Sequence, residues 1–590
     1  MGHVGVQPLR SVVVAASHGE AAHSRRAGRS TDWRTYVSEP LGVPDWPRRA
    51  KALASELADA GALTDPGWRA AVEQTPRHLF VPRFFRDDGS VVDGADPADA
   101  GEWLGAVYSD DSLVVQRAAV PGADRAWPTS SSTMPSLMVR MLEMLNVTDR
   151  SRVLEIGTAT GYNAALLCHR LVDRQVASIE LHPELAADAA ERLGALGYRP
   201  TLAVGDGAAG VPDQAPYDRI IATCAVPEIP AAWIAQLAPG GRIVADLRGE
   251  MSSSLAVLDN TDPGTVTGRL LDQAGHFMWL RPDPDNPLRD AHRFEFVADL
   301  DTAETTTTDL DPEVLAEPGL RVLLGILEPT LSPPSRGRRD GADTWWMHAE
   351  GGCWVEVVDR TVTQGGPRHL WPTVEYAVTE WRRLDRPGRG RYGLTVTGDG
   401  VHRYWLDQPD HTVAFTNVVA TRPDLTDELL RRQEVDQQAR SFALEGREAT
   451  DAEIKRLREV DRDNTAWLET VITENGWPGI RLAGQAGARA AWLLAQHADA
   501  KPELQRQWLA LLRAAVEAGD AERGNLAYLQ DRVAIHQHLP QHHGTQFLCL
   551  NGKDGLAPLE DPQRVNEYRA TAGLHPLTDD EISTAWPDYP

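Results

Sequence analysis

Hydrophobic residues between positions 150 and 248 form short β-branched runs that alternate with amphipathic stretches. Each apolar run is four to six residues long and ends near a glycine or an acidic residue, as buried strands do. The amphipathic stretches carry apolar residues at helical spacing. This rhythm predicts an α/β fold with a doubly wound, mostly parallel sheet. The predicted strands are RVLEIG (152–157), VASIEL (176–181), TLAVGD (201–206), YDRIIAT (217–223) and GRIVADL (241–247).

The chain before this region has a different pattern. Residues 47–63 carry apolar positions at helical spacing and predict a helix, whereas TPRHLFVPRFF (75–85) is a compact apolar segment interrupted by proline. Residues 1–40 show neither pattern and predict a flexible arm. We place the α/β domain at 41–300.

The remainder predicts two further domains. Trp-rich, strand-like runs over 345–407 indicate a small α+β module, placed at 301–420. We interpret the Thr-rich stretch 301–313 as a linker or exposed loop, and the Pro-, Gly- and Arg-rich stretch 331–343 as a flexible or substrate-touching loop. After Thr426 the pattern is helical throughout, which predicts an all-α domain at 421–590.

Composition excludes several classes of protein. The 590 residues include 59 Lys+Arg and 85 Asp+Glu, a net charge of −26, so nucleic acid is a poor partner. No apolar run approaches the ~20 residues of a membrane span. The four cysteines lie more than fifty residues apart, which excludes a compact metal site or disulfide framework and favours a reducing cytoplasm. They are Cys168, Cys224, Cys353 and Cys549.

Candidate chemistry lies at three successive strand ends. Gly157 and Gly161 form a tight turn between a strand and a helix, Glu180 ends the second strand and Asp206 the third. In sheets of this kind ligands bind at the carboxyl ends of the strands, where backbone N–H groups and a carboxylate hold a nucleotide. From these residues alone a dinucleotide and S-adenosylmethionine both stay open.

The motifs resemble those of the protein-L-isoaspartate O-methyltransferase family. The resemblance rests on VLEIGTATGYNAALL, SIEL, GDGAAGVPDQAPYDRIIATCAVPEIPAAWIAQLAPGGRIVADL, PRHLFVP and VYSDD, and spans Val43 to Leu247. It implies a Rossmann-like seven-stranded methyltransferase sheet and S-adenosylmethionine as cofactor, with no metal. The implied cofactor-binding residues are Glu155, Gly157, Thr158, Gly161, Glu180, Leu181, Asp206 and Gly207.

The family's active-site element is a serine before a helix. It corresponds here to SSTMPS (131–136), which puts Thr133 at the serine position. Ser131 and Ser132 are neighbours that could share the role. A carboxylate with a pKa near 4 is already ionised at neutral pH, so a hydroxyl would orient it rather than deprotonate it. The alternative is that Thr133 caps the following helix.

The chain continues for some 340 residues beyond the catalytic part. The Ser-rich element, with GGPRHLW (365–371), RYGLTV (391–396) and YWLD (404–407), resembles methyltransferases encoded beside ATP-grasp peptide cyclases, the graspetide pathways. That resemblance implies methylation of an aspartate in a modified, acidic precursor peptide and closure to an aspartimide. We prefer this function to repair of isoaspartyl proteins or to an inactive binding module. Arginines proposed to hold the peptide, or to form only a solvated loop, are Arg382, Arg383, Arg386, Arg389 and Arg391.

Residues 427–581 resemble a bacterial domain of unknown function. A polar set lies on otherwise apolar helices, which implies a buried network or a site. The hypotheses are a satisfied network, peptide binding, or hydrolysis of the aspartimide with His497 or His543 as base. A metal site is disfavoured because the pairs His536/His538 and His542/His543 fall in a predicted loop. The set is Gln496, His497, Asp499, Asp531, Arg532, His543 and Gln546.

Overall fold

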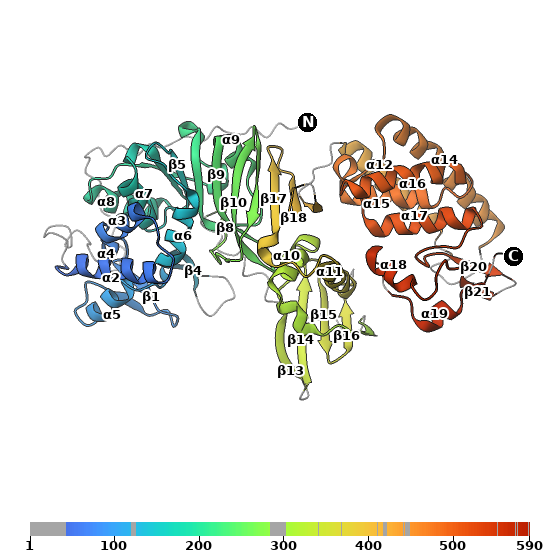
Figure 1. Cartoon of the computed structure of the whole chain (residues 1–590), viewed down its shortest axis with the longest axis horizontal. Coiled ribbons are helices and arrows are strands. Elements are labelled where there is room, and N and C mark those ends of the chain that lie inside the picture. Colours follow the sequence, from blue (N-terminus) through green and yellow to red (C-terminus); the bar gives the residue numbers. More distant parts are fainter. Residues whose placement is uncertain are drawn as a thin grey trace. The chain divides into compact units, whose positions relative to one another are not determined.

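The computed structural model describes residues 43–589 with gaps at 120–125, 284–302, 340–341, 367–368, 410, 417–421, 441, 443–448, 551–552, 573, 575 and 588. The predicted arm at 1–40 lies outside the described residues. By their internal contacts the residues form two compact units, drawn from blue to red in Figure 1. Unit 1 is Met1–Val297 with Thr395–Asp399, and unit 2 is Ala298–Leu394 with Gly400–Pro590.

Unit 1 is built on a sheet with the strand order β11-β10-β9-β8-β5-β6-β7. The five strands from β5 to β9 are parallel, while β10 and β11 are antiparallel additions. The predicted strands and their Rossmann-like order are confirmed. The bounds are β5 (Val153–Ile156), β6 (Val176–Glu180), β7 (Thr201–Val204), β8 (Tyr217–Val226), β9 (Leu237–Arg248), β10 (Ser253–Asp262) and β11 (Thr265–Leu270).

Helices cover this sheet because its central strands are apolar on both faces. All four residues of β5 are buried, and the first seven residues of α7 are buried as well. The predicted N-terminal helix is α2, which ends at Asp59 because the chain turns at Gly61 with φ +67°. The helices are α2 (Trp46–Asp59), α3 (Pro66–Gln74), α4 (Arg77–Phe80), α5 (Ala100–Val107), α6 (Pro135–Leu145), α7 (Tyr162–Arg170), α8 (Pro183–Ala195) and α9 (Ala231–Gln236).

A small antiparallel sheet with the order β2-β1-β3-β4 precedes α6 in unit 1. Its strand β4 leads directly to the predicted active-site element, because Ser131 and Ser132 are the last two residues of that strand. The bounds are β1 (Arg83–Phe85), β2 (Val91–Asp93), β3 (Leu113–Ala118) and β4 (Trp127–Ser132).

Unit 2 contains a five-stranded antiparallel sheet with the order β12-β16-β15-β14-β13. Its two edge strands correct the sequence analysis, which assigned both segments to loops. All four residues of β12 are exposed, so no period-two burial pattern marks it, although β-branched threonine favours a strand. In β13, Arg336 lies over the ring of Trp345. The bounds are β12 (Glu304–Thr307), β13 (Ser335–Arg339), β14 (Ala342–Ala349), β15 (Cys353–Val358) and β16 (Thr361–Gly365).

Further elements of this α+β part are α10 (Pro318–Leu327), α11 (Trp371–Arg383), β17 (Tyr392–Thr397), β18 (His402–Leu406) and β19 (Thr412–Thr416). The last part of β17 belongs to unit 1, where the hydroxyl of Thr395 lies 2.7 Å from that of Thr267 in β11.

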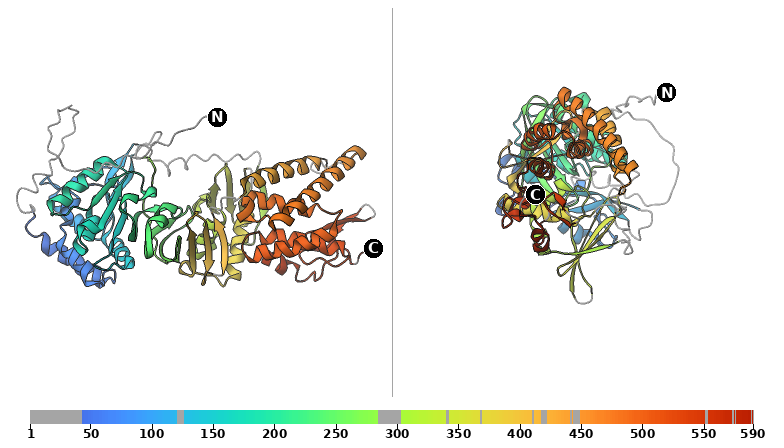
Figure 2. Two further views of the ribbon diagram at one scale, coloured as in Figure 1. Left: turned by 90° about the horizontal axis from the view of Figure 1, so that it is seen from above. Right: turned by 90° about the vertical axis from the view of Figure 1, so that its right-hand side faces the viewer.

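The predicted helical region forms a bundle. Figures 1 and 2 show helices α12 to α17, in orange and red, lying side by side. A short hairpin, β20 paired with β21, departs from the all-α expectation. The sequence did not predict it because four-residue strands are too short to show an alternating pattern. The helices are α12 (Pro423–Ala439), α14 (Asp451–Asn475), α15 (Ile480–Gln496), α16 (Pro502–Glu517), α17 (Arg523–His536), α18 (Val565–Ala572) and α19 (Asp579–Ser583), with β20 (Phe547–Leu550) and β21 (Lys553–Leu556).

None of the helices in the described ranges combines the length and hydropathy that a bilayer span requires.

Candidate functional site

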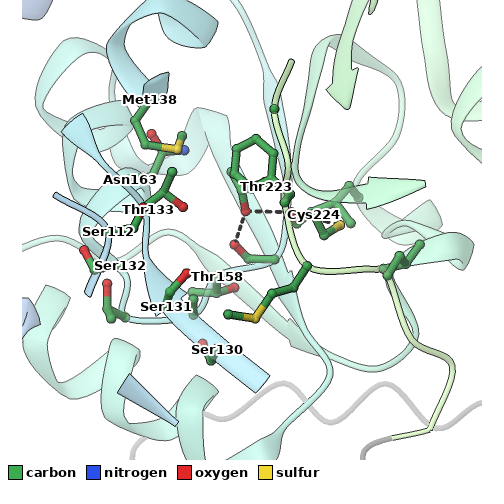
Figure 3. A pocket seen from close by; sticks show the side chains of 18 of the residues that line it. Ser112, Ser130, Ser131, Ser132, Thr133, Met138, Thr158, Asn163, Thr223 and Cys224 are labelled. Carbon is green, nitrogen blue, oxygen red and sulfur yellow. Dashed lines mark hydrogen bonds between the residues drawn. The ribbon is translucent and has the colours of Figure 1, made fainter. Parts of the chain in front are cut away.

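A cavity of about 470 Å³ opens at the carboxyl ends of β5, β6 and β8 in unit 1. Figure 3 shows the hydroxyl groups of Ser131, Thr133 and Thr158 around it. Five of the predicted cofactor residues line the cavity, as do all three predicted catalytic hydroxyl residues. The lining members of the two sets are Gly157, Thr158, Glu180, Leu181 and Gly207, with Ser131, Ser132 and Thr133. The other three predicted cofactor residues, Glu155, Gly161 and Asp206, are not among its lining residues.

The turn after β5 needs glycine at two positions. Gly157 has φ +94°, and a Cβ there would lie 2.8 Å from Thr223 Oγ1. That hydroxyl is held in place by the carbonyl oxygen of Gly157, 2.7 Å away. Gly161 has φ +87°, and a Cβ there would come within 3.0 Å of Ala189 Cβ. The first glycine therefore leaves room for the Thr223 hydroxyl at the cavity wall, and the second allows α7 and α8 to pack closely.

Glu155 lies beneath the turn and is completely buried. Its carboxylate accepts hydrogen bonds from Asn163 Nδ2 at 2.7 Å and Ser178 Oγ at 2.6 Å. Ser178 Oγ also lies 2.6 Å from Thr158 Oγ1. Burial raises the pKa of Glu155 to about 7. Glu155 thus holds the turn from below, and a direct contact with the cofactor stays a prediction.

Glu180, at the end of β6, does line the cavity. Its Oε2 accepts the Ala159 N–H at 2.7 Å, and its Oε1 accepts the His182 N–H at 3.1 Å. These two backbone bonds fix the carboxylate, and each oxygen keeps a lone pair that a ribose hydroxyl can use. Asp206 instead caps the short helix after β7 by accepting the Ala208 N–H at 2.9 Å.

The hydroxyl groups after β4 are not equivalent. Ser132 Oγ accepts a hydrogen bond from Arg77 at 3.4 Å. The side chains of Ser131 and Thr133 have no hydrogen-bond partner in the part of the chain that the structure describes. Met134, not Thr133, occupies the N-cap position of α6, and no side chain caps this helix. The helix-cap alternative for Thr133 is therefore wrong, and its hydroxyl is available to a ligand.

Arg77 positions this segment, and the sequence analysis did not identify it as a functional residue. Its guanidinium is completely buried and donates to four carbonyl oxygens and to one hydroxyl. Burial lowers its pKa. The motif PRHLFVP, which contains Arg77, was the available signal. The acceptors are the carbonyl oxygens of Val107 (2.9 Å), Ser109 (3.0 Å), Asp111 (3.1 Å) and Thr133 (3.2 Å), and Ser132 Oγ (3.4 Å).

An irregular segment, residues 273–281, forms another wall of the cavity. It runs beside the end of β8, because Ala225 donates to the Met278 carbonyl and accepts from the Leu280 N–H, both at 2.8 Å. The buried carboxylate of Asp246 accepts the Phe277 N–H at 3.1 Å. The segment has no regular pattern, so sequence periodicity could not identify it.

The proposed peptide-holding arginines belong to unit 2. Arg383 pairs with Glu380 at 2.7 Å and Arg391 pairs with Asp407 at 2.8 Å. Arg382, at the end of α11, is exposed. Arg386 follows α11, and Arg389 begins a short 3-10 helix. A role of these five arginines in peptide binding stays a prediction.

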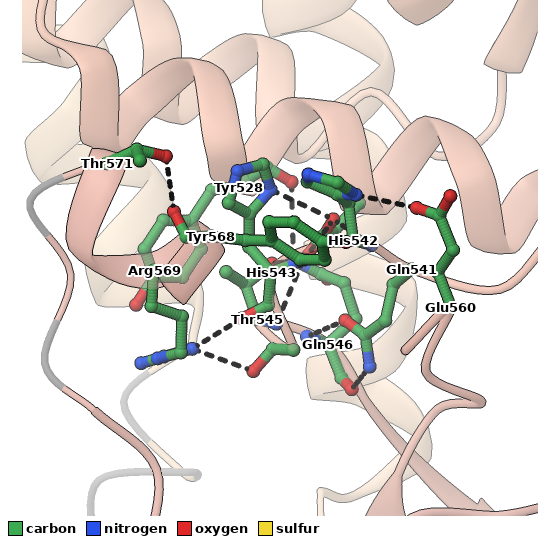
Figure 4. Close-up of polar contacts among 12 residues, drawn as sticks. Tyr528, Gln541, His542, His543, Thr545, Gln546, Glu560, Tyr568, Arg569 and Thr571 are labelled. Carbon is green, nitrogen blue, oxygen red and sulfur yellow. Dashed lines mark hydrogen bonds and ion pairs between the residues drawn. The ribbon is translucent and has the colours of Figure 1, made fainter. Parts of the chain in front are cut away.

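The C-terminal polar set separates into several clusters, one of which is drawn in Figure 4. Asp531 accepts the N–H groups of His542, His543 and Thr545 at 2.9 to 3.1 Å. Gln546 donates its N–H to Gln541 at 2.8 Å. This cluster ties the loop after α17 to that helix.

The remaining members of the set lie on α15 and α17 or follow α15. His497 contacts Asp436, which the sequence analysis missed, with 3.0 Å between Nδ1 and the carboxylate. Asp499 lies 3.7 Å from both Arg532 and His536. Gln496 donates to the Tyr528 carbonyl at 3.3 Å.

His536 is the last residue of α17 and not part of the predicted loop. Within the described ranges no group of three or more His, Cys, Asp or Glu side chains is arranged to hold a metal ion.

Two family models match the chain. The model described as "Protein-L-isoaspartate(D-aspartate) O-methyltransferase (PCMT)" matches residues 48–276, and that described as "Family of unknown function (DUF6624)" matches residues 423–583. The first range contains the glycine turn and most of the residues that line the cavity, while the lining residues 277–281 lie beyond it.

Curated relatives match a similar length of the chain. "Protein-L-isoaspartate O-methyltransferase 1" of Anaeromyxobacter sp. (strain Fw109-5) is 36% identical over 221 residues, which are 36% of this chain and 87% of the relative. "Protein-L-isoaspartate O-methyltransferase" of Roseiflexus castenholzii is 34% identical over 229 residues, 39% of this chain and 90% of the relative. A solved protein-L-isoaspartate O-methyltransferase covers 61% of this chain and all of its own, with 21% identity and a TM-score of 0.38.

The chain is a protein carboxyl O-methyltransferase with S-adenosylmethionine as its cofactor. Gly157, whose missing Cβ leaves room for the Thr223 hydroxyl at the cavity wall, and Glu180, with its fixed carboxylate, are residues that fit this cofactor. On the strength of curated relatives that it matches over most of their length, the chain belongs to the protein-L-isoaspartate O-methyltransferase family.

Proposed function

We propose that the enzyme methylates the free α-carboxylate of L-isoaspartyl residues in damaged proteins and peptides. The comparisons support this repair function better than the aspartate-tailoring function that the sequence analysis preferred. The structural observation that supports it is the pair of unbonded hydroxyls, Ser131 and Thr133, on the wall of the cavity.

Different residues of the cavity would bind the cofactor and orient the acceptor carboxylate. Gly157, Thr158, Glu180, Leu181 and Gly207 would hold S-adenosylmethionine. The bound cofactor supplies an electrophilic methyl group on a sulfonium centre. Because the acceptor carboxylate is ionised at neutral pH, the protein needs only to orient it and to exclude water.

Thr133 and Ser131 can donate hydrogen bonds to that carboxylate. A hydrogen bond to a charged acceptor is short and directional, so it restricts the angle at which an oxygen approaches. Arg77 keeps these hydroxyls in place, since it holds the carbonyl of Thr133 and the hydroxyl of Ser132 from the buried side. The cationic side chain itself is buried, so its role is to position the segment.

The test uses one peptide sequence made twice, once with L-isoaspartate and once with L-aspartate at the same position. We expect the full-length enzyme with labelled S-adenosylmethionine to form a base-labile methyl ester on the isoaspartyl peptide at least 100-fold faster, since a misplaced carboxylate costs about that factor. Equal rates on both peptides would contradict the proposal. Preferential methylation of the aspartyl peptide would support the candidate that follows.

A second candidate, methylation of an aspartate in a ribosomally made precursor peptide, is favoured by one observation. The relatives are matched over 87–90% of their length by only 36–39% of this chain, so most of unit 2 has no counterpart in them. Such a region can recognise a dedicated substrate. Incubation with the precursor encoded beside the gene should then add one methyl group and afterwards leave a peptide one water lighter. A precursor of unchanged mass would contradict this candidate.

If the precursor is acidic, the exposed Arg382 offers the simplest check on how it is held. Arg382→Gln should raise the KM for that peptide only a few-fold, because exposed charge pairs contribute about 1 kcal/mol or less.

A further inference from the structure

A histidine supported by a buried carboxylate lies among helices α12, α14 and α15 of unit 2. Asp436 of α12 is completely buried, and His497 is the residue that follows α15. The Nδ1 atom of His497 lies 3.0 Å from both carboxylate oxygens. The histidine ring is therefore held by two oxygens at once.

Two further charged groups complete this cluster. Arg440, the residue that follows α12, donates to Asp436 Oδ1 at 2.7 Å through one nitrogen and to Asp461 of α14 at 2.7 Å through another. Gln437 donates to Asp436 Oδ2 at 3.0 Å. The positive guanidinium next to Asp436 compensates the negative charge of its carboxylate in the interior.

This arrangement fixes where the histidine proton lies. An ionised carboxylate only accepts hydrogen bonds, so Nδ1 of His497 must be the donor. The neutral ring then carries its lone pair on Nε2. Within the part of the chain that the structure describes, Nε2 makes no hydrogen bond or ion pair. The side chain is 17% exposed while that of Asp436 is 0% exposed, so water can reach the ring but not the carboxylate behind it.

Two other histidine–carboxylate contacts of unit 2 lack this combination. His543 lies 3.4 Å from Asp531, which already accepts three backbone N–H groups. His542 contacts Glu560 at 2.6 Å, but that carboxylate is 59% exposed, and the ring stacks on Tyr568. The first pair serves to hold a loop, and the second lies at the surface.

Stability does not account for the Asp436 cluster. Burying an ion pair costs about as much solvation free energy as the pairing returns, and apolar side chains of the same size often stabilise a core better. A buried carboxylate that accepts from Nδ1 and leaves Nε2 without a protein partner is the arrangement that makes histidine a general base in hydrolytic enzymes. His497 is thus equipped to activate water.

The proposed methyl transfer supplies a substrate for such a base. Methoxide leaves a carbonyl more readily than hydroxide, so a methyl ester beside a peptide bond reacts with the next backbone nitrogen, releases methanol and closes a five-membered imide. This imide persists until water opens it. We propose that His497 is the general base of a second catalytic site, which opens such cyclic imides in peptides. This inference rests on the proposed function for its substrate.

The step balances without any further reactant. Nε2 of His497 takes a proton from water while the water oxygen bonds to one imide carbonyl carbon. The bond from that carbon to the imide nitrogen then breaks, and the protonated histidine returns its proton to the nitrogen. The products are a carboxylic acid and a restored backbone amide. Asp436 does not touch the substrate and acts as a positioning residue.

The test supplies the imide directly and so does not depend on methyl transfer. A synthetic peptide containing one succinimide is incubated with the full-length protein, and ring opening is followed by chromatography and mass. We expect opening faster than in buffer, and a loss of about 100-fold or more of the acceleration in His497→Gln, as for removal of a general base. Added imidazole should restore part of the rate to His497→Ala. Asp436→Asn should lower kcat and leave KM unchanged.

The matched control is His536→Gln. His536 also lies at a helix end in unit 2, but its Nδ1 bonds to the neutral amide oxygen of Gln505 at 2.8 Å. This variant should open the imide at the wild-type rate. The inference is overturned if the wild-type protein does not exceed buffer, if His497→Gln equals wild type, or if His536→Gln loses as much as His497→Gln.

Methyl transfer to the isoaspartyl peptide is measured on the same preparations and should be unchanged in all the variants. A protein that opens the imide without methylating the isoaspartyl peptide would refute the proposed function and keep this inference. A protein that methylates the isoaspartyl peptide without opening the imide would refute this inference and keep the proposed function.

Discussion

The methyl-transfer cavity of unit 1 and the Asp531 cluster of unit 2 are both rich in polar groups, but they satisfy these groups differently. Around the cavity, the hydroxyls of Ser131 and Thr133 have no hydrogen-bond partner among the described residues. In the other cluster, Asp531 is completely buried and accepts three backbone N–H groups and the hydroxyl of Thr545.

The difference teaches how to separate a binding site from a structural network. A polar group already paired inside the protein would have to lose its partner to bind a ligand, whereas an unpaired group at a cavity wall gains one. Buried groups such as Arg77 and Glu155 belong to the cavity only through the segments that they hold. The following predictions test this distinction, beginning with the largest expected effect.

Replacing the buried guanidinium should damage both the fold and the site of unit 1. Arg77→Met leaves four carbonyl oxygens without their donor, so we expect the free energy of unfolding to fall by roughly 3–5 kcal/mol. Methyl transfer should fall about 100-fold even below the melting temperature, because the Thr133 segment is displaced. Calorimetry and initial rates measure the two effects.

The control for this variant is Arg69→Met. Arg69 is an exposed residue of α3, 3.0 Å from Glu73, and its loss should change stability by no more than about 0.5 kcal/mol. If both variants behave alike, Arg77 does not have the positioning role described.

Replacing the saturated carboxylate should affect stability alone. Asp531→Asn introduces a donor where only acceptors fit, and we expect the bundle of unit 2 to lose about 3 kcal/mol of unfolding free energy. Methyl transfer should remain at the wild-type rate. The exposed carboxylate Glu567, 2.9 Å from Arg564, provides the control Glu567→Gln with almost no change. A loss of methyl transfer in Asp531→Asn would break the comparison between the two clusters.

The buried carboxyl of Glu155 predicts a pH dependence. Burial raises its pKa from 4.5 to about 7 in the folded protein, so the folded state binds this proton more tightly than the unfolded state. Its contribution to stability is complete below pH 4.5 and is lost as the pH rises through about 7, by roughly 3 kcal/mol. The difference in unfolding free energy between wild type and Glu155→Gln should therefore change across this window. A difference independent of pH would show that Glu155 titrates normally.

A methyl group at the glycine turn should weaken cofactor binding. In Gly157→Ala the positive φ and the contact with Thr223 together cost about 1–3 kcal/mol, so the Kd for S-adenosylmethionine should rise roughly 10- to 100-fold. Gly197 has φ +84° but nothing within 4 Å of its Cβ position, so Gly197→Ala carries the backbone cost alone. Titration calorimetry on both variants separates the effect of the contact with Thr223 on cofactor affinity from the effect of the positive φ. Equal affinities would mean that the cavity tolerates a methyl group at Gly157.

Removing one unpaired hydroxyl should have the smallest effect. Thr133→Val should lower kcat about 10-fold, the value of one hydrogen bond to a charged group, and leave the KM for S-adenosylmethionine unchanged. Thr133→Ser should keep most of the activity. Thr129, whose hydroxyl donates to Gln116 at 2.9 Å, is the paired counterpart, and Thr129→Val should stay within about 3-fold of wild type. A normal kcat in Thr133→Val would assign the orientation of the carboxylate to Ser131.

The sequence by itself determined which segments form the strands of the α/β core and that the ligand site lies at the carboxyl ends of those strands. Strands buried on both faces have a continuous apolar pattern. A turn glycine such as Gly157 can be recognised in the sequence because it lies between a predicted strand and a predicted helix. It also located Thr133 and Glu180 beside the same cavity. The edge strands β12 and β13 were not predicted, because an exposed strand shows no alternation of apolar and polar residues and its Thr or Arg content is equally typical of a loop.

Only the tertiary structure decided which polar residues act together. Arg77 lies more than fifty residues from Ser132, and Asp436 lies sixty-one residues from His497. Local periodicity contains no information on such pairs, because packing of separate elements brings them into contact. For the same reason the sequence could not separate Glu155, in β5, from Glu180, at the end of β6: the first is buried beneath the turn, and the second lines the cavity.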